Sequence, residues 1–315
     1  MSTVQPLDLA AGASGTALPG RRRRFRGLPY GLLLPAVAVI IVALGYPLVR
    51  QVWLSFHEFG LKQQFGQPAE WVGLANYVEL ATDPYLWEVL GRSVLFCLVN
   101  AAVTLGLGLF IALVMQAMSA GVRIATQAAL LLAWAMPVLA VLTVWQWMFD
   151  TTYGVVNWAL TALGGDFSGH SWLIEPLSFF GIATLIIVWM SVPFVAFTVY
   201  AGLTQVSTDA IEAAMLDGAG TLARVRHIML PAIKPVLAVV GLLQIVWDLR
   251  VFTQIYVLQR AGGTASDTNL LGTYVYRLGI GEGSFGMAAA VAMFLLAVTI
   301  VLTSPYLVTM FRQED

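Results

Sequence analysis

Residues Pro176–Thr208 read PLSFFGIATLIIVWMSVPFVAFTVYAGLTQVST, a run of 33 residues with no Asp, Glu, Lys or Arg. A helix needs about 20 mainly apolar residues to cross a hydrocarbon core about 30 Å thick. The run is longer than that and contains no charge that lipid would have to accommodate. It therefore predicts a transmembrane helix, and with it a membrane protein.

Four further runs share this property, and a fifth nearly does. Segment 235–259 is equally apolar but carries Asp248 and Arg250 near its middle. We count it as a span, because its neighbours would otherwise lie on the wrong sides of the membrane. The sequence thus predicts an all-α membrane protein with six transmembrane helices, and Pro137 and Pro193 are expected to kink the third and fourth. The expected spans are about 30–53, 93–117, 126–149, 179–203, 236–259 and 287–310, within a domain of residues 30–311 between a disordered basic tail at 1–29 and a short tail at 312–315.

The composition agrees with this class. The chain is 59% hydrophobic and only 10% charged, whereas soluble domains are about 45–50% apolar and about 25% charged. The net charge of −1 excludes a strongly basic nucleic-acid binder. The single cysteine, Cys97, excludes an intramolecular disulfide framework and any metal site built from several cysteines.

The distribution of Lys and Arg predicts the orientation of the helices. Cytoplasmic loops carry an excess of these residues. With the N-terminus inside, ten of them fall in cytoplasmic segments and four in outer segments. We therefore expect both termini, and the long loop between the fourth and fifth helices, to lie in the cytoplasm.

That loop, residues 204–234, carries a regular pattern. Asp209 and Glu212 have the spacing of a capping box at the start of a helix. Gly218 follows where this helix should stop, because glycine adopts the left-handed conformation without steric cost. We expect Thr221 to cap a second short helix.

Pro231 should end that second helix, since proline lacks an N–H. The predicted product is a helix–turn–helix with an apolar face. It could rest in the lipid interface or dock against a partner protein. The acidic first helix, with Asp209, Glu212 and Asp217, favours a protein partner, because interfacial helices favour Lys and Arg.

The same loop resembles a known family signature. It matches the EAA motif of binding-protein-dependent ABC importer permeases at every position, and other stretches are similar to the maltose-type sugar permeases of that family. The matching residues are Glu212, Ala213, Ala214, Gly218, Ile228, Leu230 and Pro231.

The resemblance implies a mechanism and a set of partners. The loop would be the coupling element, with Glu212, Asp217 and Gly218 at its joint with a cytoplasmic ABC ATPase dimer. That ATPase would use ATP and Mg, while this chain would bind no cofactor and catalyse no reaction. A second homologous permease, expected to form a heterodimer with this chain, and an extracytoplasmic solute-binding protein would complete the assembly. The substrate would be a sugar, of di- or oligosaccharide size, and the location the cell membrane of a prokaryote.

Ionisable residues inside a span indicate a substrate or ion pathway. Asp248 and Arg250 lie two residues apart, so their side chains point about 200° apart on a helix and should not pair with each other. Gln244, Trp247 and Tyr256 flank them and suit the recognition of a polyol. The alternative is a structural role, as a buried salt bridge or a link to the second permease.

Other functions remain open from the residues alone. The same type of importer could carry another small solute, such as a polyol phosphate. An ion-coupled secondary transporter would predict related halves and paired discontinuous helices, and the sequence predicts neither. No phosphate-binding GxxxxGK[ST] or zinc-type HExxH motif is present. An ATP-driven importer would therefore need a separate ATPase.

Overall fold

The computed structural model describes residues 28–311, so the predicted tail at 312–315 and nearly all of the tail at 1–29 lie outside the described residues. Five helical segments among them are long and apolar enough to cross a membrane. A sixth is counted when α6 (Ala120–Trp134) and α7 (Val138–Met148), which meet at 94°, are taken as one broken span. These are the six charge-poor segments of the sequence, and the all-α membrane class is confirmed.

The chain forms two units, residues 1–49 and 50–315. The first contains α1 (Leu28–Ile40), the π-helical turn η1 (Ile41–Gly45) and the beginning of α2 (Tyr46–Ser55). Its apolar side chains are exposed, Leu32 to 74%. Exposed leucines, valines and isoleucines along a whole helix are what a lipid-facing span requires.

The second unit is built around α5 (Pro84–Ala117) and α9 (Pro176–Leu203), which pack along each other. The buried positions of α5 recur every three or four residues, so they form one stripe. Small residues in this stripe, such as Gly108 and Ala112, let the two backbones approach closely, as is common between membrane helices. Helix α9 continues through Pro193 without interruption.

Helix α5 starts at Pro84, nine residues before the predicted start at 93. The side chain of Asp83 caps it by accepting a hydrogen bond from the Tyr85 N–H at 2.9 Å. Glu88 and Arg92, which ended the charge-free run in the sequence, form an ion pair within the added turns. The charges therefore do not mark the end of the helix.

The third span is interrupted at Pro137, where α6 and α7 meet at 94°. The sequence predicted a kink here, and the observed break is much sharper. Proline donates no backbone hydrogen bond and disfavours the helical conformation of the residue before it. The turn at 135–137 separates the two helices completely.

The fifth predicted span, 236–259, is also interrupted. Helix α12 (Leu230–Leu249) ends at Arg250, and α13 (Thr253–Arg260) begins three residues later. Lys234–Arg260 still qualifies as one candidate span, with a local break in the helix at 250–252. A Cβ on Gly272 would lie 3.0 Å from the Val251 carbonyl oxygen, so this glycine lets a neighbouring segment pack against the break.

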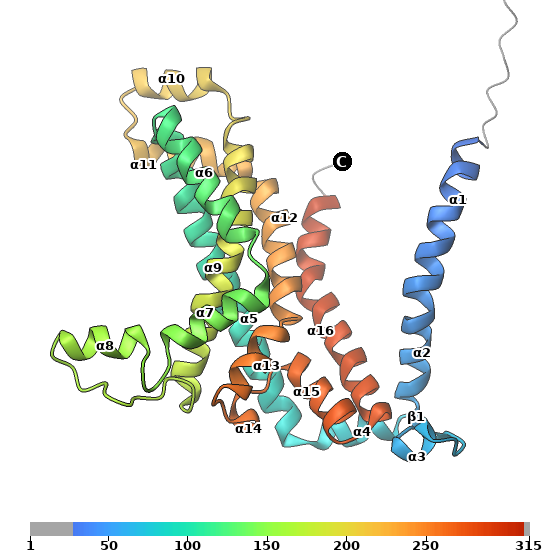
Figure 1. Ribbon diagram of the computed structural model, residues 1–315. Coiled ribbons are helices and arrows are strands. Elements are labelled where there is room, and N and C mark those ends of the chain that lie inside the picture. The colour runs from blue at the N-terminus through green and yellow to red at the C-terminus, as the bar shows by residue number, and fades with distance from the viewer. Residues whose placement is uncertain (1–27, 312–315) are drawn as a thin grey trace, which may run out of the picture. The chain divides into compact units, whose positions relative to one another are not determined.

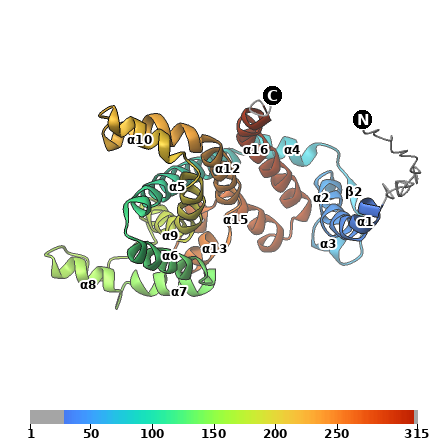
Figure 2. The same ribbon diagram turned by 90° about the horizontal axis from the view of Figure 1, so that it is seen from above.

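The two ends of the second unit differ in character. Helix α10 lies at one end, and α4, α8 and the α13–α15 region lie at the other (Figure 1). Seen from above, α5, α9 and α12 lie side by side (Figure 2), in agreement with their contacts. The remaining elements are β1 (His57–Glu58), α3 (Leu61–Gln64), β2 (Glu70–Trp71), α4 (Ala75–Thr82), α8 (Val155–Ala162), α10 (Thr208–Leu216), α11 (Thr221–Arg224), η2 (Val225–Met229), α14 (Ala265–Thr268), α15 (Leu271–Tyr276), η3 (Arg277–Gly281) and α16 (Phe285–Phe311), with β1 and β2 pairing antiparallel.

At the end opposite α10, polar side chains tie the helix starts together. Tyr274 on α15 donates a hydrogen bond to Asp83, the residue that caps α5, at 3.1 Å. Burial, and then the nearby Asp83 carboxylate, raise the pKa of Tyr274. This tyrosine therefore stays a neutral donor at physiological pH and holds α15 against the start of α5.

The close approach of α5 and α9 makes a direct prediction. A Cβ on Gly108 would lie 2.5 Å from Val195 Cγ1 and 2.7 Å from Val195 Cβ. Gly108→Ala should therefore lower the free energy of unfolding by about 1–3 kcal/mol, because the contact between α5 and α9 has no room for a methyl group. Unfolding by SDS titration in mixed micelles measures this.

Gly106→Ala on the same helix is the matched control, since nothing lies within 4 Å of its added Cβ. It should be neutral, or stabilising by up to about 1 kcal/mol through helix propensity. Equal stability of the two variants would show that the helices are not packed as described.

Candidate functional site

The loop between α9 and α12 begins with an ordered helix, α10. Its N-cap is Ser207, whose Oγ accepts a hydrogen bond from the Ala210 N–H at 3.4 Å. The predicted capping box at Asp209 and Glu212 is therefore wrong. Asp209 already lies inside the first turn, where its negative charge favours the helix N-terminus.

Helix α10 ends as the sequence predicted. Gly218 has a φ of +80°, the left-handed conformation that favours glycine. Its N–H donates to the Met215 carbonyl at 3.1 Å, and the Ala219 N–H donates to the Ala214 carbonyl at 2.9 Å. This pair of bonds is the Schellman motif, which satisfies the last carbonyls of the helix.

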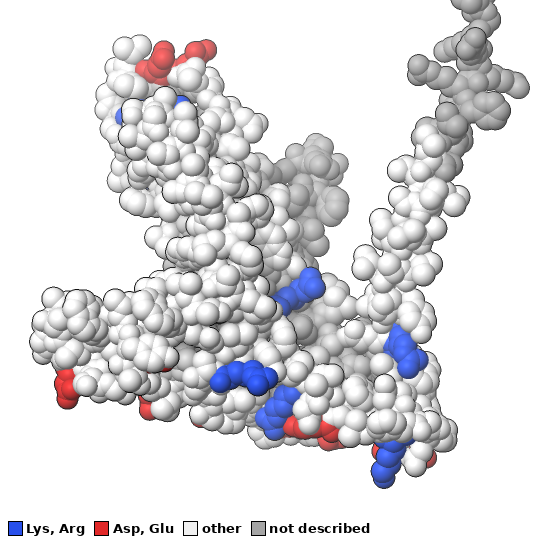
Figure 3. Space-filling model, viewed as in Figure 1, with Lys and Arg blue, Asp and Glu red and all other residues white. Residues whose placement is uncertain are grey.

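No residue of α10 is buried. Glu212, Ala213, Asp217 and Gly218 are exposed, and Ala214 is half-buried. Large apolar side chains are exposed beside them: Leu216 is 91% exposed, Leu222 79% and Met215 55%. Figure 3 shows acidic side chains at this end of the unit. Apolar groups next to acids on an unsupported helix are typical of a surface that binds another protein.

The second half of the loop is continuous with the fifth span. The four-residue helix α11 is capped by Gly220 and not, as predicted, by Thr221, which is already helical. The chain then passes through the π-turn η2 directly into α12. The Leu230 N–H bonds to the Val225 carbonyl, five residues back, so the widened turn makes room for the ring of Pro231.

Pro231 therefore does not end the helix, contrary to the prediction. It lies in the first turn of α12, where proline is tolerated because its missing N–H would have no partner. Ile228 and Leu230 are half-buried, and Met229 and Ile233 pack with residues of α5 and α9. The signature residues thus divide into an exposed group on α10 and a group anchored in the spans.

The predicted pathway residues lie on different faces of α12. Asp248 is 3% exposed and Gln244 is 1% exposed. The Gln244 Nε2 donates to Asp248 Oδ1 at 3.0 Å and to Oδ2 at 3.1 Å. Arg250 is exposed and forms no ion pair among the described residues, so the two charges do not contact each other, as their spacing indicated.

Helix α5 also buries polar groups that sequence reasoning did not single out. Asn100 and Thr104, one helical turn apart on α5, are fully buried. The Asn100 Oδ1, the Thr104 Oγ1 and the Gln244 Oε1 have no hydrogen-bond partner. Buried polar atoms in native proteins usually have partners, so these three oxygens are unusual among the described residues.

Trp247 and Tyr256 also separate. Trp247 is 45% exposed and contacts Phe194 of α9 with ring centroids 5.0 Å apart. Tyr256 lies beyond the helix break on α13. Its ring stacks on Phe252 at 5.3 Å, and its Oη accepts a hydrogen bond from Arg260 at 3.2 Å.

Tyr276, the last residue of α15, belongs to the same aromatic group. Its Oη lies 3.4 Å from the Oη of Tyr256. Phe252, Tyr256 and Arg260 recur every four residues, so helical spacing could have found the first and last of them. No local signal could have found Tyr276, because it comes from a different helix.

The comparisons with known proteins assign the chain to a family. The family model of the binding-protein-dependent transport system inner membrane component matches residues 104–309, a range that contains the whole α10–α12 region. The chain belongs to this family. The sequence predicted no discontinuous helices, yet two spans are broken, at Pro137 and at 250–252. Because the chain belongs to this family, these breaks do not indicate a secondary transporter.

Similar permeases occur in several prokaryotes. The diacetylchitobiose uptake system permease protein DasB of Streptomyces coelicolor is 38% identical, over 100% of this chain and 95% of its own length. The trehalose/maltose transport system permease protein MalF of Thermococcus litoralis is 32% identical, over 91% and 95%. The sulfoquinovosyl glycerol transport system permease protein SmoG of Agrobacterium fabrum is 32% identical, over 90% of each chain.

A solved structure has the same fold. It is a chain of a bacterial alginate ABC transporter, determined in complex with an alginate pentasaccharide-bound periplasmic protein. The match has a TM-score of 0.76 at 22% identity and covers 89% of this chain and 92% of that chain. As an inner membrane component with several apolar helices, the permease is a multi-pass membrane protein. Among residues 28–311, no three His, Cys, Asp or Glu side chains lie together as a metal ion would require.

The left-handed turn after α10 gives a prediction for this permease. Gly218→Ala should destabilise the turn by about 1–2 kcal/mol, because a Cβ is strained at positive φ. Hydrogen exchange of a peptide covering residues 206–224 should become about 5- to 30-fold faster, in line with that free energy.

Gly220→Ala provides the control, because Gly220 has a φ of −63° and nothing lies within 4 Å of its added Cβ. Its exchange should match that of the wild type. Unchanged exchange in Gly218→Ala would contradict the described turn.

Proposed function

We propose that this chain is the permease subunit of an ATP-driven, binding-protein-dependent importer and forms part of the translocation path for a di- or oligosaccharide. The observation that carries the proposal is the exposed α10, joined through α11 and η2 to α12, in a member of this permease family. The relatives named above support a sugar, because their names specify diacetylchitobiose, trehalose or maltose, and sulfoquinovosyl glycerol.

The partners follow from the same proposal. A cytoplasmic ABC ATPase dimer binds α10 through Glu212, Ala213, Asp217 and Gly218, and it uses the ATP and Mg. A second homologous permease completes the path as a heterodimer, and an extracytoplasmic solute-binding protein delivers the sugar. The α10 end and both termini lie in the cytoplasm, in agreement with the distribution of Lys and Arg. This chain itself carries out no catalysis.

The structure supports a route for the movement. ATP-driven closure of the ATPase displaces α10, and rigid helices transmit such displacements. The chain from α11 through η2 to α12 has no loop that would absorb the motion. Met229 and Ile233 pass it to α5 and α9, while the break at 250–252 lets α12 move relative to α13.

Trp247, Arg250 and Tyr256 are the proposed sugar contacts. The buried Gln244–Asp248 pair joins the path when α12 moves relative to α5. A carboxylate and an amide are groups that can hydrogen-bond the hydroxyls of a sugar. A phosphorylated polyol is the second candidate substrate. Arg250 favours this substrate, because its guanidinium is exposed within a candidate span and forms no ion pair among residues 28–311.

The coupling proposal predicts a charge-dependent association. Glu212→Lys should reduce the amount of ATPase that co-purifies with the solubilised permease pair by at least about tenfold, since reversing a charge at a docking surface costs about 1.4 kcal/mol or more. Asp209→Lys is the control on the same exposed helix, outside the signature, and should retain most of the ATPase. Equal retention by Glu212→Lys and the wild type would overturn the coupling role.

The pathway proposal predicts selective loss of transport. Asp248→Asn and Arg250→Gln should each lower uptake of labelled disaccharides several-fold while the complex still assembles, because each replaces a charged group by a neutral amide. Arg277→Gln, which removes an exposed ion pair with Glu282 and a cation–π contact with Tyr85, should transport normally. Vesicles containing the whole importer provide the measurement. Normal uptake by both path variants would contradict the assignment.

A further inference from the structure

Helices α7 and α8 carry an apolar surface to which the permease function assigns no role. Helix α6 packs beside α9 and has 15 residues, about 22 Å of helix, so it falls short of a hydrocarbon core about 30 Å thick. After the 94° bend at Pro137, α7 runs across the direction of the spans, and α8 extends further from them (Figure 1).

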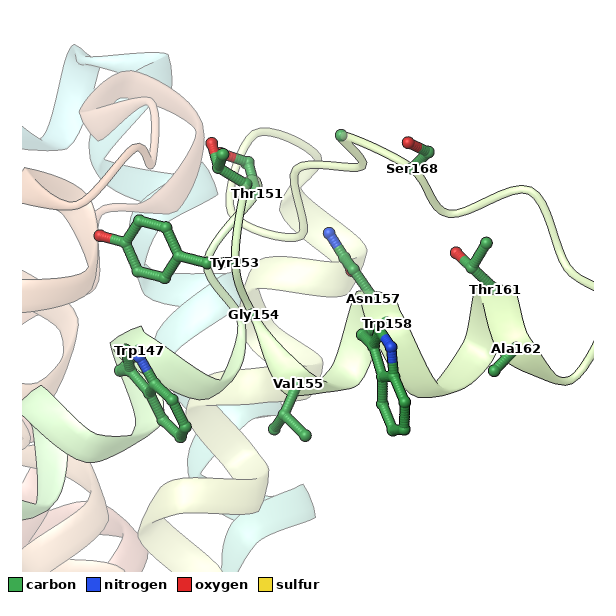
Figure 4. Close-up of a pocket in the computed structure, with 12 residues that line it drawn as sticks. Trp147, Thr151, Tyr153, Gly154, Val155, Asn157, Trp158, Thr161, Ala162 and Ser168 are labelled. Carbon is green, nitrogen blue, oxygen red and sulfur yellow. The ribbon is translucent and has the colours of Figure 1, made fainter.

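The two sides of this segment differ. Trp147, Val155 and Trp158 point to one side, while Asn157 points to the other, toward the loop that carries Ser168 (Figure 4). Together they line an open hollow of about 640 Å³. The side chains that point away from the loop are apolar, so α7 and α8 present an amphipathic surface.

The polar side is already occupied by this chain. Asn157 is 5% exposed, donates to the His170 carbonyl at 2.8 Å and accepts from the Trp172 indole N–H at 2.5 Å. Asp150 Oδ1 accepts from the backbone N–H of Thr152 at 2.8 Å. The loop after α8 therefore covers one side of the helix, and only the tryptophan side lacks a partner.

The uncovered side is strongly apolar and uncharged. Trp158 is 71% exposed, Trp147 54% and Leu163 84%. No Asp, Glu, Lys or Arg occurs in residues 151–165. Tryptophan concentrates at membrane–water boundaries, where its ring is in the apolar layer and its N–H meets the headgroups.

We infer that α8 and the end of α7 form an anchor that lies in the lipid interface of the leaflet opposite α10. Trp147, Val155, Trp158 and Leu163 enter the boundary between headgroups and acyl chains, and the loop at 164–172 faces water. Lipid fits better than a protein partner for two reasons. The segment continues directly from a membrane span, so the bilayer is its immediate neighbour. In the face that Figure 3 shows, the acidic side chains near α8 lie on the edge away from α10, where water would be.

The anchor has a consequence for the path. Gln146 of α7 donates to the Val257 carbonyl of α13 at 3.2 Å, and Phe149 packs with the core residues Ile255 and Leu258 of α13. The anchor therefore holds α13, which carries Tyr256, at a fixed depth. The break at 250–252 then separates two parts of the fifth span: α13, which the anchor fixes to the lipid, and α12, which moves with α10.

Spin-label accessibility in bilayers tests the anchor. The full chain with Cys97→Ala carries one nitroxide, at Trp158→Cys or at the control Ser168→Cys on the loop side of the hollow, in phosphatidylethanolamine–phosphatidylglycerol vesicles. The ratio of collisions with oxygen to collisions with a water-soluble nickel chelate should be at least about fivefold higher at 158, because interfacial helices bury their apolar face about 5–10 Å deep.

Two outcomes would overturn the inference. Equal nickel accessibility at 158 and 168 would place this face in water. An immobile label at 158 that is shielded from both reagents would place it against a protein, either the second permease or the solute-binding protein once these are added. Both substituted side chains are exposed, so neither variant disturbs the core.

Discussion

The backbone hydrogen-bonding requirement of a lipid environment governs this structure. Hydrocarbon offers no partner for an N–H or C=O group, so spanning segments must be helical, and irregular backbone is tolerated only where protein or water surrounds it. The long charge-free segments become helices for this reason. The two interruptions, at Pro137 and at 250–252, are next to packed protein: Gln146 bonds to α13, and Gly272 lies against the Val251 carbonyl.

These interruptions give the permease parts that can move separately. Helix α10 has no buried residue, whereas η2 and α12 pack into α5 and α9. A force applied to α10 therefore reaches the spans through the short turn at 217–220 and then through α11, η2 and α12 without a further loop. On the other side of the break, α13 is held by α7 and by the tyrosine contacts of α15. The buried Gln244–Asp248 pair lies near the end of α12, just before the break.

Much of this arrangement was readable from the sequence. Five charge-free runs predicted five of the spans, because a charge in lipid is costly, and the apolar segment around Asp248 and Arg250 predicted another. The position of Gly218 predicted the end of α10, because glycine adopts a positive φ easily. The EAA residues gave the family. The pairing of Gln244 with Asp248 could also have been predicted, since residues four apart on a helix are neighbours.

The remaining features depend on tertiary structure. No proline or glycine marks the break at 250–252, which forms where another segment packs against it. Pro231 predicts a helix end, yet the π-turn before it accommodates the ring, and a π-turn has no sequence signal. The meeting of Tyr276 with Tyr256 joins two helices whose relative position the sequence does not encode locally.

The central claim is that α10 is the contact through which an ATPase drives the spans. Leu216 is 91% exposed at the end of this helix, beside Gly218. A photoreactive amino acid at position 216 of the permease, in membranes that contain the whole importer, tests the claim most directly. We predict that illumination cross-links it to the ATPase subunit. Cross-linking to lipid or to the solute-binding protein instead would contradict the account.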